Sequence, residues 1–344
     1  MYLLIKKTSL FYNKIVGSKY FLLFNLMLKI TNPISELIIE LRVVPNFIKG
    51  IALLNIYYHA RYNLDFECYF LKRSQFINFL NHNIDCGKKK LLSKELEVFK
   101  SVILLDKLIQ DRSFNKAKSV FYELCKKLPQ CLDYEIFKEK KILYIGSAPV
   151  IMKDIDFSNF DLIIVNNFLE NDLISKKIPL KKTVIFYNKG FAARYKNEIK
   201  KLSKVCRSIY VKDMDNSEHK RFIEATYFLA NDYGSMGAQN VLLALVLGSA
   251  SEVTVHGVNG FLSKNSYTKG LKKYTINEQH ISNILRRHEF ISNHHFLVLV
   301  FNIIQINGSE EFVNLAKLKT SSYSRLINKK YGKFLIKRLD GYGF

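Results

Sequence analysis

The sequence predicts an α/β fold, a Rossmann-like parallel sheet with helices on both faces, preceded by an all-helical region. Three observations lead to this prediction. From residue 140 onward, short β-rich runs alternate with helical patterns. The runs are apolar throughout, which is typical of parallel strands buried on both faces. Glycine or asparagine follows several of them, at the strand ends where such sheets bind ligands.

Residues 1–138 are expected to be helical. Apolar residues recur at helical spacing, and predict helices near residues 34–41, 48–62, 70–81, 91–110 and 113–129. Pro33 would occupy the first turn of the first helix. These segments contain no recognisable catalytic motif. We therefore expect an accessory region that lies against a membrane.

Residues 139–310 are expected to form the ligand-binding domain. Its predicted strands are Ile142–Ile145, Leu162–Val165, Val184–Tyr187, Ser208–Val211, Val253–His256 and Phe301–Ile306. The longest helix between them should span Ala238 to Leu247. Residues 258–287 are polar and contain glycine, as expected of a lid or binding loop. Residues 311–344 are basic and predict a surface appendage.

The net positive charge of the chain indicates which classes of binding partner to expect. The formal net charge of +23 fits nucleic acid, an anionic membrane surface or anionic substrates. Lysine and arginine are dispersed and surround no nucleic-acid-binding module, which disfavours nucleic acid. The five cysteines are widely spaced without a CxxC pair, as in a reducing compartment. The apolar run from Tyr20 to Leu28 is too short to span a bilayer. A cytoplasmic protein peripheral to the membrane is expected.

Polar residues follow three of the predicted strands. Gly146 and Ser147 open the turn GSAP, where a glycine lets main-chain N–H groups approach a phosphate or ribose. The further glycines of the dinucleotide fingerprint are absent. Asn166 and Asn188 end the next two strands, and amides can pair with a nucleobase or with sugar hydroxyls. Turn residues without a ligand remain the alternative for each of them.

A second candidate segment runs from Gly234 to Phe261. Ser235 and Gly237 open a helix whose free N–H groups favour an anion. The strand after this helix brings Gly257 and Asn259 to the same edge of the sheet. A helix simply capped by Ser235 and closed by Gly248 is the alternative.

A metal-independent site is expected. The adjacent residues His294 and His295 would point to different faces of a helix, which is poor for joint metal binding. Asp154 and Asp156 lie in the loop after GSAP, where they are expected to cap a helix. Without a metal, a tyrosine hydroxyl such as that of Tyr267 could stabilise a leaving phosphate.

Taken in order, these motifs resemble those of bacterial sialyltransferases of glycosyltransferase family 42, and more distantly the sialylmotifs of the animal enzymes. GSAP followed by IDFSNFD is similar to the first family motif, and Phe-Tyr-Asn is intact at residues 186–188. The resemblance covers about residues 140–307. The chain departs from the family at Ser147, where the family turn has asparagine, and at Phe261, where the family has a phosphate-binding tyrosine.

The resemblance implies a GT-A-like variant of the fold and an inverting, metal-independent transfer without a cofactor. Sialic acid would pass from CMP-sialic acid to a hydroxyl of a cell-surface glycan, lipooligosaccharide or capsule. His288 would act as the general base and Tyr267 would hold the leaving phosphate. The donor site implied is Gly146, Ser147, Asn166, Asn188, Ser235, Gly237 and Asn259.

Several questions stay open at this point. A glycosyltransferase with a different nucleotide-sugar donor is one alternative, and a non-catalytic binding or scaffold protein is another. The expected partners are a nucleotide-sugar donor, a glycan acceptor and the anionic surface of the inner membrane, with no nucleic acid. A homo-oligomer is left open.

Overall fold

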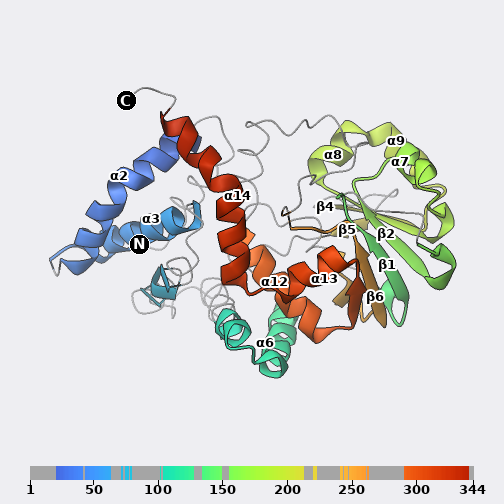
Figure 1. The fold of residues 1–344 in the computed structure, drawn as a ribbon, viewed down its shortest axis with the longest axis horizontal. Helices are drawn as coiled ribbons and strands as arrows, with labels where there is room; N and C mark the ends of the chain where they lie inside the picture. The colour runs from blue at the N-terminus through green and yellow to red at the C-terminus, as the bar shows by residue number, and fades with distance from the viewer. Residues whose placement is uncertain are drawn as a thin grey trace.

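A computed structural model gives the fold of the chain (Figure 1). It describes residues 21–41, 43–62, 71–72, 74–76, 78–79, 101, 104–127, 134–148, 155–212, 220–222, 241–242, 244–246, 248–260, 262 and 290–340. Within these residues the predicted α/β architecture is confirmed.

The centre of the fold is a sheet of seven parallel strands. They are β1 (Lys141–Ile145), β2 (Leu162–Asn166), β3 (Thr183–Tyr187), β4 (Ser208–Lys212), β5 (Lys220–Phe222), β6 (Glu252–His256) and β7 (Ile306–Gly308). Their order across the sheet is β5-β4-β3-β2-β1-β6-β7. The chain therefore starts at β1, builds the sheet in one direction, and then returns to build it in the other. The switch point between the two directions lies between β1 and β6.

Helices cover both faces of the sheet (Figure 1). One face packs against α7 (Glu170–Ser175), α8 (Lys189–Arg194) and α9 (Lys196–Leu202), through residues such as Leu173 and Ile199. The other packs against α6 (Phe114–Lys127), α12 (Phe290–Ile303), α13 (Glu310–Lys317) and α14 (Thr320–Asp340). Burial on both faces explains why the strands read as continuous apolar runs.

In its described part, the N-terminal region contributes a helical hairpin and two helical segments of the core. α2 (Phe21–Glu40) packs against α3 (Asn46–Tyr62) away from the sheet (Figure 1). Pro33 lies inside α2 rather than in its first turn, because the helix begins twelve residues earlier than predicted, at Phe21 rather than Pro33. Farther along the chain, α6 and the helical residues 104–110 join the large core beside the sheet. The predicted helices near 48–62 and 113–129 are thereby confirmed.

The prediction of a strand over Phe301–Ile306 is wrong. Phe301 to Ile303 end α12, and only Ile306 belongs to a strand. The physical reason is that α12 is buried on nearly all sides, so its sequence is apolar without a helical period. A short apolar run of this kind does not distinguish a buried helix from a buried strand.

The C-terminal segment is not a surface appendage, at least up to Ile327. Phe312, Leu315, Tyr323 and Ile327 are buried in the core that α12 also joins. In addition, the Tyr323 hydroxyl donates a hydrogen bond to the carbonyl of Gly260, at 2.9 Å. On α14, Arg325 and Lys329 are exposed, whereas Tyr323 and Ile327 on the same helix are buried.

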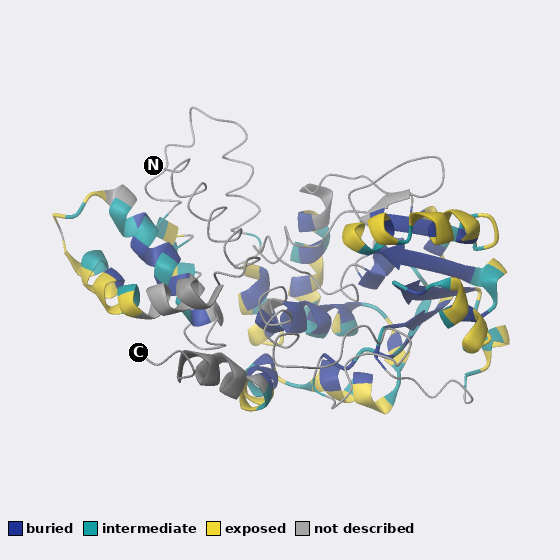
Figure 2. Cartoon of the chain, turned by 90° about the horizontal axis from the view of Figure 1, so that it is seen from above, coloured by how far each residue is buried: buried dark blue, intermediate teal, exposed yellow. Residues whose placement is uncertain are grey.

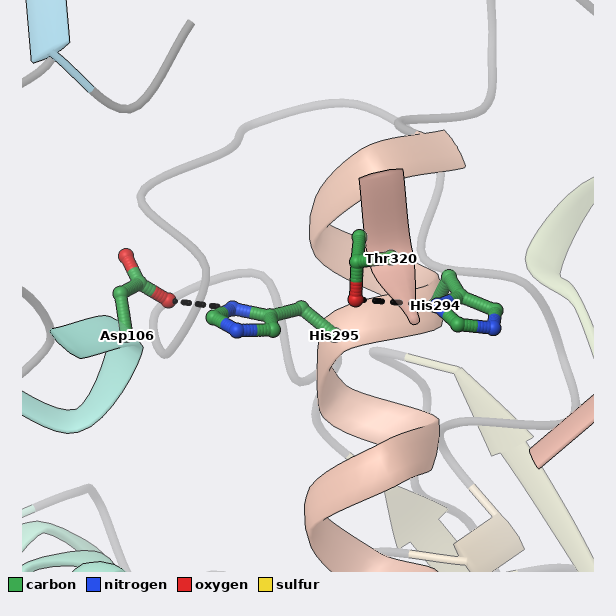
Figure 3. A network of polar contacts seen from close by, with 4 residues as sticks. All are labelled: Asp106, His294, His295 and Thr320. Atoms are coloured by element: carbon green, nitrogen blue, oxygen red, sulfur yellow. Dashed lines mark hydrogen bonds and ion pairs between the residues drawn. The ribbon is translucent and has the colours of Figure 1, made fainter. Parts of the chain in front are cut away.

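Two adjacent histidines on α12 connect it to different neighbours (Figure 3). The carbonyl of Leu315 can only accept, so Nε2 of His294 donates to it, at 2.9 Å. Nδ1 of His294 is then the acceptor for the Thr320 hydroxyl, at 3.1 Å. Nδ1 of His295 donates to the carboxylate of Asp106 at 2.9 Å, on the opposite side of the helix. As predicted, the two rings point apart, and each has a structural role.

The state of His294 makes stability depend on pH. Burial lowers the pKa of His294 to about 4, whereas an unfolded histidine titrates near its ordinary value of 6.5. As the pH falls, His294 is therefore protonated in the unfolded chain at a higher pH than in the folded protein. The contribution of neutral His294 to the free energy of unfolding should be fully present above pH 6.5. It should decrease by about 3 kcal/mol between pH 6.5 and 4.

The variant His294→Phe tests this, because it keeps an aromatic ring next to Tyr323 but cannot be protonated. The free energy of unfolding, measured in urea, should be lower for the variant at pH 7, and the difference should shrink toward pH 4. A difference that stays constant across this range would contradict a neutral, buried His294.

Candidate functional site

Two loops meet at the switch point of the sheet. The loop after β1 begins with Gly146, and the loop after β6 begins with Gly257. The N–H of Gly146 donates to the carbonyl of His256 at 2.7 Å, and the N–H of Ala148 donates to the carbonyl of Gly257 at 3.0 Å. In doubly wound sheets, ligands bind in the crevice outside the strand ends at this point. The sequence motifs GSAP and HGVNG are thus brought together where a ligand is expected.

Glycine is required for this contact. A Cβ on Gly146 would lie 2.3 Å from the carbonyl oxygen of Gly257, closer than any real Cβ contact. Gly257 itself has φ +66°, a conformation that side-chain-bearing residues rarely adopt. The two main chains therefore touch directly at Gly146, and the Val258 side chain lies close beside them.

Ser147 offers donors at this edge. It is half-buried, and neither its N–H nor its hydroxyl has a hydrogen-bond partner among the residues that the structure describes. An N–H group and a hydroxyl at the end of a parallel strand can hydrogen-bond a phosphate oxygen or a sugar hydroxyl. Serine thus supplies donors at the position where the resembled family has asparagine.

Asn166 places an unpaired acceptor at the end of the next strand. The side chain is 6% exposed, and its Nδ2 donates to the hydroxyl of Tyr144 at 2.9 Å. Its Oδ1 is buried and has no partner in the described part of the chain. Burial raises the pKa of Tyr144 far above its usual range, so its hydroxyl keeps its proton. A buried carbonyl oxygen without a donor is costly, and a ligand donor would remove this cost.

Asn167 and Asn188 shape the neighbouring strand ends. Asn167 adopts φ +55°, and its Oδ1 accepts from the N–H of Asn188 at 3.1 Å. The Oδ1 of Asn188 caps α8 by accepting from the N–H of Phe191 at 2.7 Å. Only the Nδ2 group of Asn188 therefore remains for a ligand, and this side chain is exposed. Of the three asparagines at the ends of β2 and β3, Asn167 and Asn188 thus make hydrogen bonds that stabilise the fold.

Asn259 lies in the loop after β6, two residues beyond Gly257. It is 5% exposed, and its carbonyl accepts from the N–H of Leu262 at 3.0 Å. The next residue, Gly260, is held by the hydroxyl of Tyr323. This loop is therefore fixed from the side of α14, and its position against Gly146 does not depend on a ligand.

His256 is a candidate that our reading of the sequence missed. It is the last residue of β6 and pairs with Ile145 of β1 in the sheet. Its ring is half-buried, and the described residues offer it no hydrogen-bond partner. Burial lowers its pKa below the ordinary value, so the ring is neutral at pH 7. A histidine placed directly before a glycine at a strand end is the sequence signal that could have identified it.

Four predicted site residues lie outside the described residues, namely Ser235, Gly237, Tyr267 and His288. Of the expected lid, only residues 258–260 and 262 are described. The structure therefore brings Gly146, Ser147 and Asn259 to the switch point, with Asn166 and Asn188 at the neighbouring strand ends.

Asp156, near the turn, has a structural role, and Asp154 lies outside the described residues. Asp156 caps the short 3₁₀ helix Phe157–Asn159, accepting from the N–H of Ser158 at 2.9 Å and from its hydroxyl at 2.7 Å. These hydrogen bonds lower the pKa of Asp156. The predicted capping role is confirmed for this residue. Among the described residues, no group of three or more His, Cys, Asp or Glu side chains could hold a metal ion.

Comparisons with known proteins add no relative. No family model, no curated protein and no solved structure matches the chain.

The contact at the switch point predicts a difference between two glycine variants. Gly146→Ala should destabilise the protein by about 1–3 kcal/mol, because the new methyl group overlaps the carbonyl of Gly257. Gly190→Ala is the matched control, since its Cβ would meet only the Oδ1 of Asn188, at 3.8 Å, inside a helix that favours alanine. Urea unfolding measures both, and equal stability of the two variants would contradict the contact.

Proposed function

We propose that the chain is a glycosyltransferase that takes a nucleotide-sugar donor at the switch point between β1 and β6, with CMP-sialic acid as the donor. The observation that carries the proposal is the meeting of two glycine loops beside a buried, unpaired Asn166 oxygen. The acceptor is a hydroxyl of a cell-surface glycan, lipooligosaccharide or capsule. The order of the sequence motifs, which resembles family 42, supports the choice of donor.

The polar atoms of Ser147 and Asn166 suit different parts of the nucleotide-sugar donor. Ser147 has donors without a partner among the described residues, so it suits the phosphate or a sugar hydroxyl. The Oδ1 of Asn166 is an acceptor and needs a donor from the ligand. A phosphate has no such donor, whereas cytosine has an exocyclic amine and ribose has hydroxyls. Asn166 therefore suits the nucleoside, and a cytosine amine would favour CMP over UMP, which has a carbonyl at that position.

The proposed transfer is a direct displacement with inversion. His288 removes the proton from the acceptor hydroxyl, the oxygen attacks the anomeric carbon, and the bond from that carbon to the phosphate oxygen breaks. CMP leaves with the bonding electrons, and Tyr267 donates a hydrogen bond to its phosphate. A well-placed imidazole typically accelerates such a step by about 10²–10⁴-fold. His256, at the end of β6 beside Ile145, is a described histidine at the edge of the sheet where the donor is proposed to bind.

We also propose that the protein works at the cytoplasmic surface of the inner membrane. Among the described residues, no helix is long and apolar enough to cross a bilayer. The net charge of +23 would attract the chain to anionic lipids, where lipid-linked acceptors are found.

Nucleotide binding tests the donor. CMP should raise the melting temperature of the protein by a few degrees at saturating concentration, and UDP and GDP should do so less. Asn166→Ala should weaken CMP binding about 10-fold, because the acceptor for the nucleoside is lost. Asn302→Ala is the control, since this exposed asparagine on α12 donates its hydrogen bond to Val298 of the same helix.

Each outcome has a separate meaning. If another nucleotide stabilises the protein selectively, the proposed donor is wrong, and the proposed nucleotide site at the switch point is retained. No stabilisation by any nucleotide would favour a non-catalytic binding or scaffold protein and would contradict the proposal.

Transfer assays test the base. His288→Ala should lower the transfer rate by about 10²-fold or more, with CMP binding unchanged. Tyr267→Phe should slow transfer with little change in stability. A fully active His288→Ala protein would refute this assignment. His280, which lies in the predicted lid, would be substituted next, and then His256.

A further inference from the structure

The outer side of α2 is an exposed apolar stripe. Ile30, Ile34, Leu37 and Leu41 are spaced by four, three and four residues, so they follow one another along a single face. Their exposed fractions are 61%, 54%, 58% and 43%. Leu41 continues the helical turn, because its N–H donates to the carbonyl of Leu37 at 3.2 Å. We call these four residues the α2 stripe.

The side of α2 that packs against α3 is polar where it is most buried. Ser35 is 3% exposed, and its hydroxyl oxygen accepts from the Nδ2 of Asn55 on α3, at 3.5 Å. Among the described α2 side chains, from Ile30 to Glu40, Ser35 alone is fully buried. A helix in water normally shows the reverse pattern, with apolar residues inside. α2 is therefore already packed through its other side, and the stripe is left over.

The stripe leads to the end of the hairpin that is farthest from the sheet. The turn between α2 and α3 lies at the outer end of the molecule (Figure 1), and Figure 2 shows exposed residues along this part of the hairpin. Val43, in the turn, is 90% exposed. From Ile30 to Leu41 the stripe is about 16 Å long. An apolar edge of this length beside an exposed turn can reach a flat surface.

We propose that the α2 stripe inserts into the interfacial layer of an anionic lipid bilayer and holds the protein on the membrane. This inference rests on the membrane association proposed above and names the surface that performs it. An exposed stripe of large aliphatic residues that is too short to span a bilayer is typical of helices that lie in the interface.

The charge of the chain selects lipid over a second copy of the protein. Two copies that each carry +23 repel one another, whereas an anionic leaflet attracts the same charge. The helix α14 lies beside α2 and exposes Arg325 and Lys329 in its described part. The carboxylates of α2, Glu36 and Glu40, are exposed but fall outside the spacing of the stripe.

Vesicle sedimentation of the full chain tests the proposal. The double variant Ile34→Gln with Leu37→Gln should bind phosphatidylglycerol–phosphatidylcholine vesicles about 10-fold less than the unchanged protein. The matched control is Ile174→Gln with Val205→Gln, at positions that are 60% and 44% exposed beside the sheet. This control should bind as the unchanged protein does, and pure phosphatidylcholine vesicles should bind all three weakly.

A fluorescent reporter gives a second readout that needs no loss of binding. The sequence contains no tryptophan, so Leu37→Trp introduces a single indole. Its emission should shift to shorter wavelength when anionic vesicles are added, and that of Ile174→Trp should not. Unshifted emission from Leu37→Trp on vesicle-bound protein would overturn the proposal.

The outcomes separate the docking surface from the other proposals. Equal vesicle binding by the stripe variant and the unchanged protein overturns the α2 stripe and leaves membrane association standing. Failure of the unchanged protein to bind anionic vesicles overturns both, while CMP binding still tests the donor site by itself. A dimer that light scattering shows to dissociate in the stripe variant would assign the stripe to contacts between copies, and would also overturn the proposal.

Discussion

The candidate site depends on the direct main-chain contact between the loops after β1 and β6. The N–H groups of Gly146 and Ala148 donate to the carbonyls of His256 and Gly257. The two main chains lie so close that a methyl group on Gly146 would not fit. The contact joins the two halves of the sheet at the point where the chain reverses direction. Near this contact, Ser147, the His256 ring, the Oδ1 of Asn166 and the Nδ2 of Asn188 have no hydrogen-bond partner among the described residues.

Elements distant in sequence support this contact. Tyr323 on α14 bonds to Gly260 in the loop after β6, and His294 and His295 connect α12 to α14 and to the helical residues 104–110. The helical first part of the chain and the basic last part therefore share one core with the sheet. The α2–α3 hairpin is different, because α2 turns apolar residues outward. A fixed contact between the two loops and a projecting hairpin are what the proposed membrane-bound transferase would need.

The sheet and its switch point could be predicted from the sequence because parallel strands buried on both faces are apolar along their whole length. Five of the six predicted strands are present. The sixth failed since α12 is equally apolar, and β5 was missed because Lys220–Phe222 is short and basic. Local spacing identified Asn166 and Asn188 as strand-end residues. It could not show that Asn188 caps α8 whereas Asn166 keeps a free oxygen, because that difference arises from contacts with Phe191 and Tyr144.

The most direct test of the account is where CMP binds. The chain has fifteen glycines, so selective ¹⁵N labelling of glycine gives a resolvable amide spectrum of the full protein. On titration with CMP, the amides of Gly146 and Gly257 should shift most. The amide of Gly248 should stay in place, since this residue packs against Tyr134 and Phe137, before the amino ends of β1 and β6. Saturable shifts confined to other glycines, with Gly146 and Gly257 unchanged, would contradict a nucleotide site at the switch point.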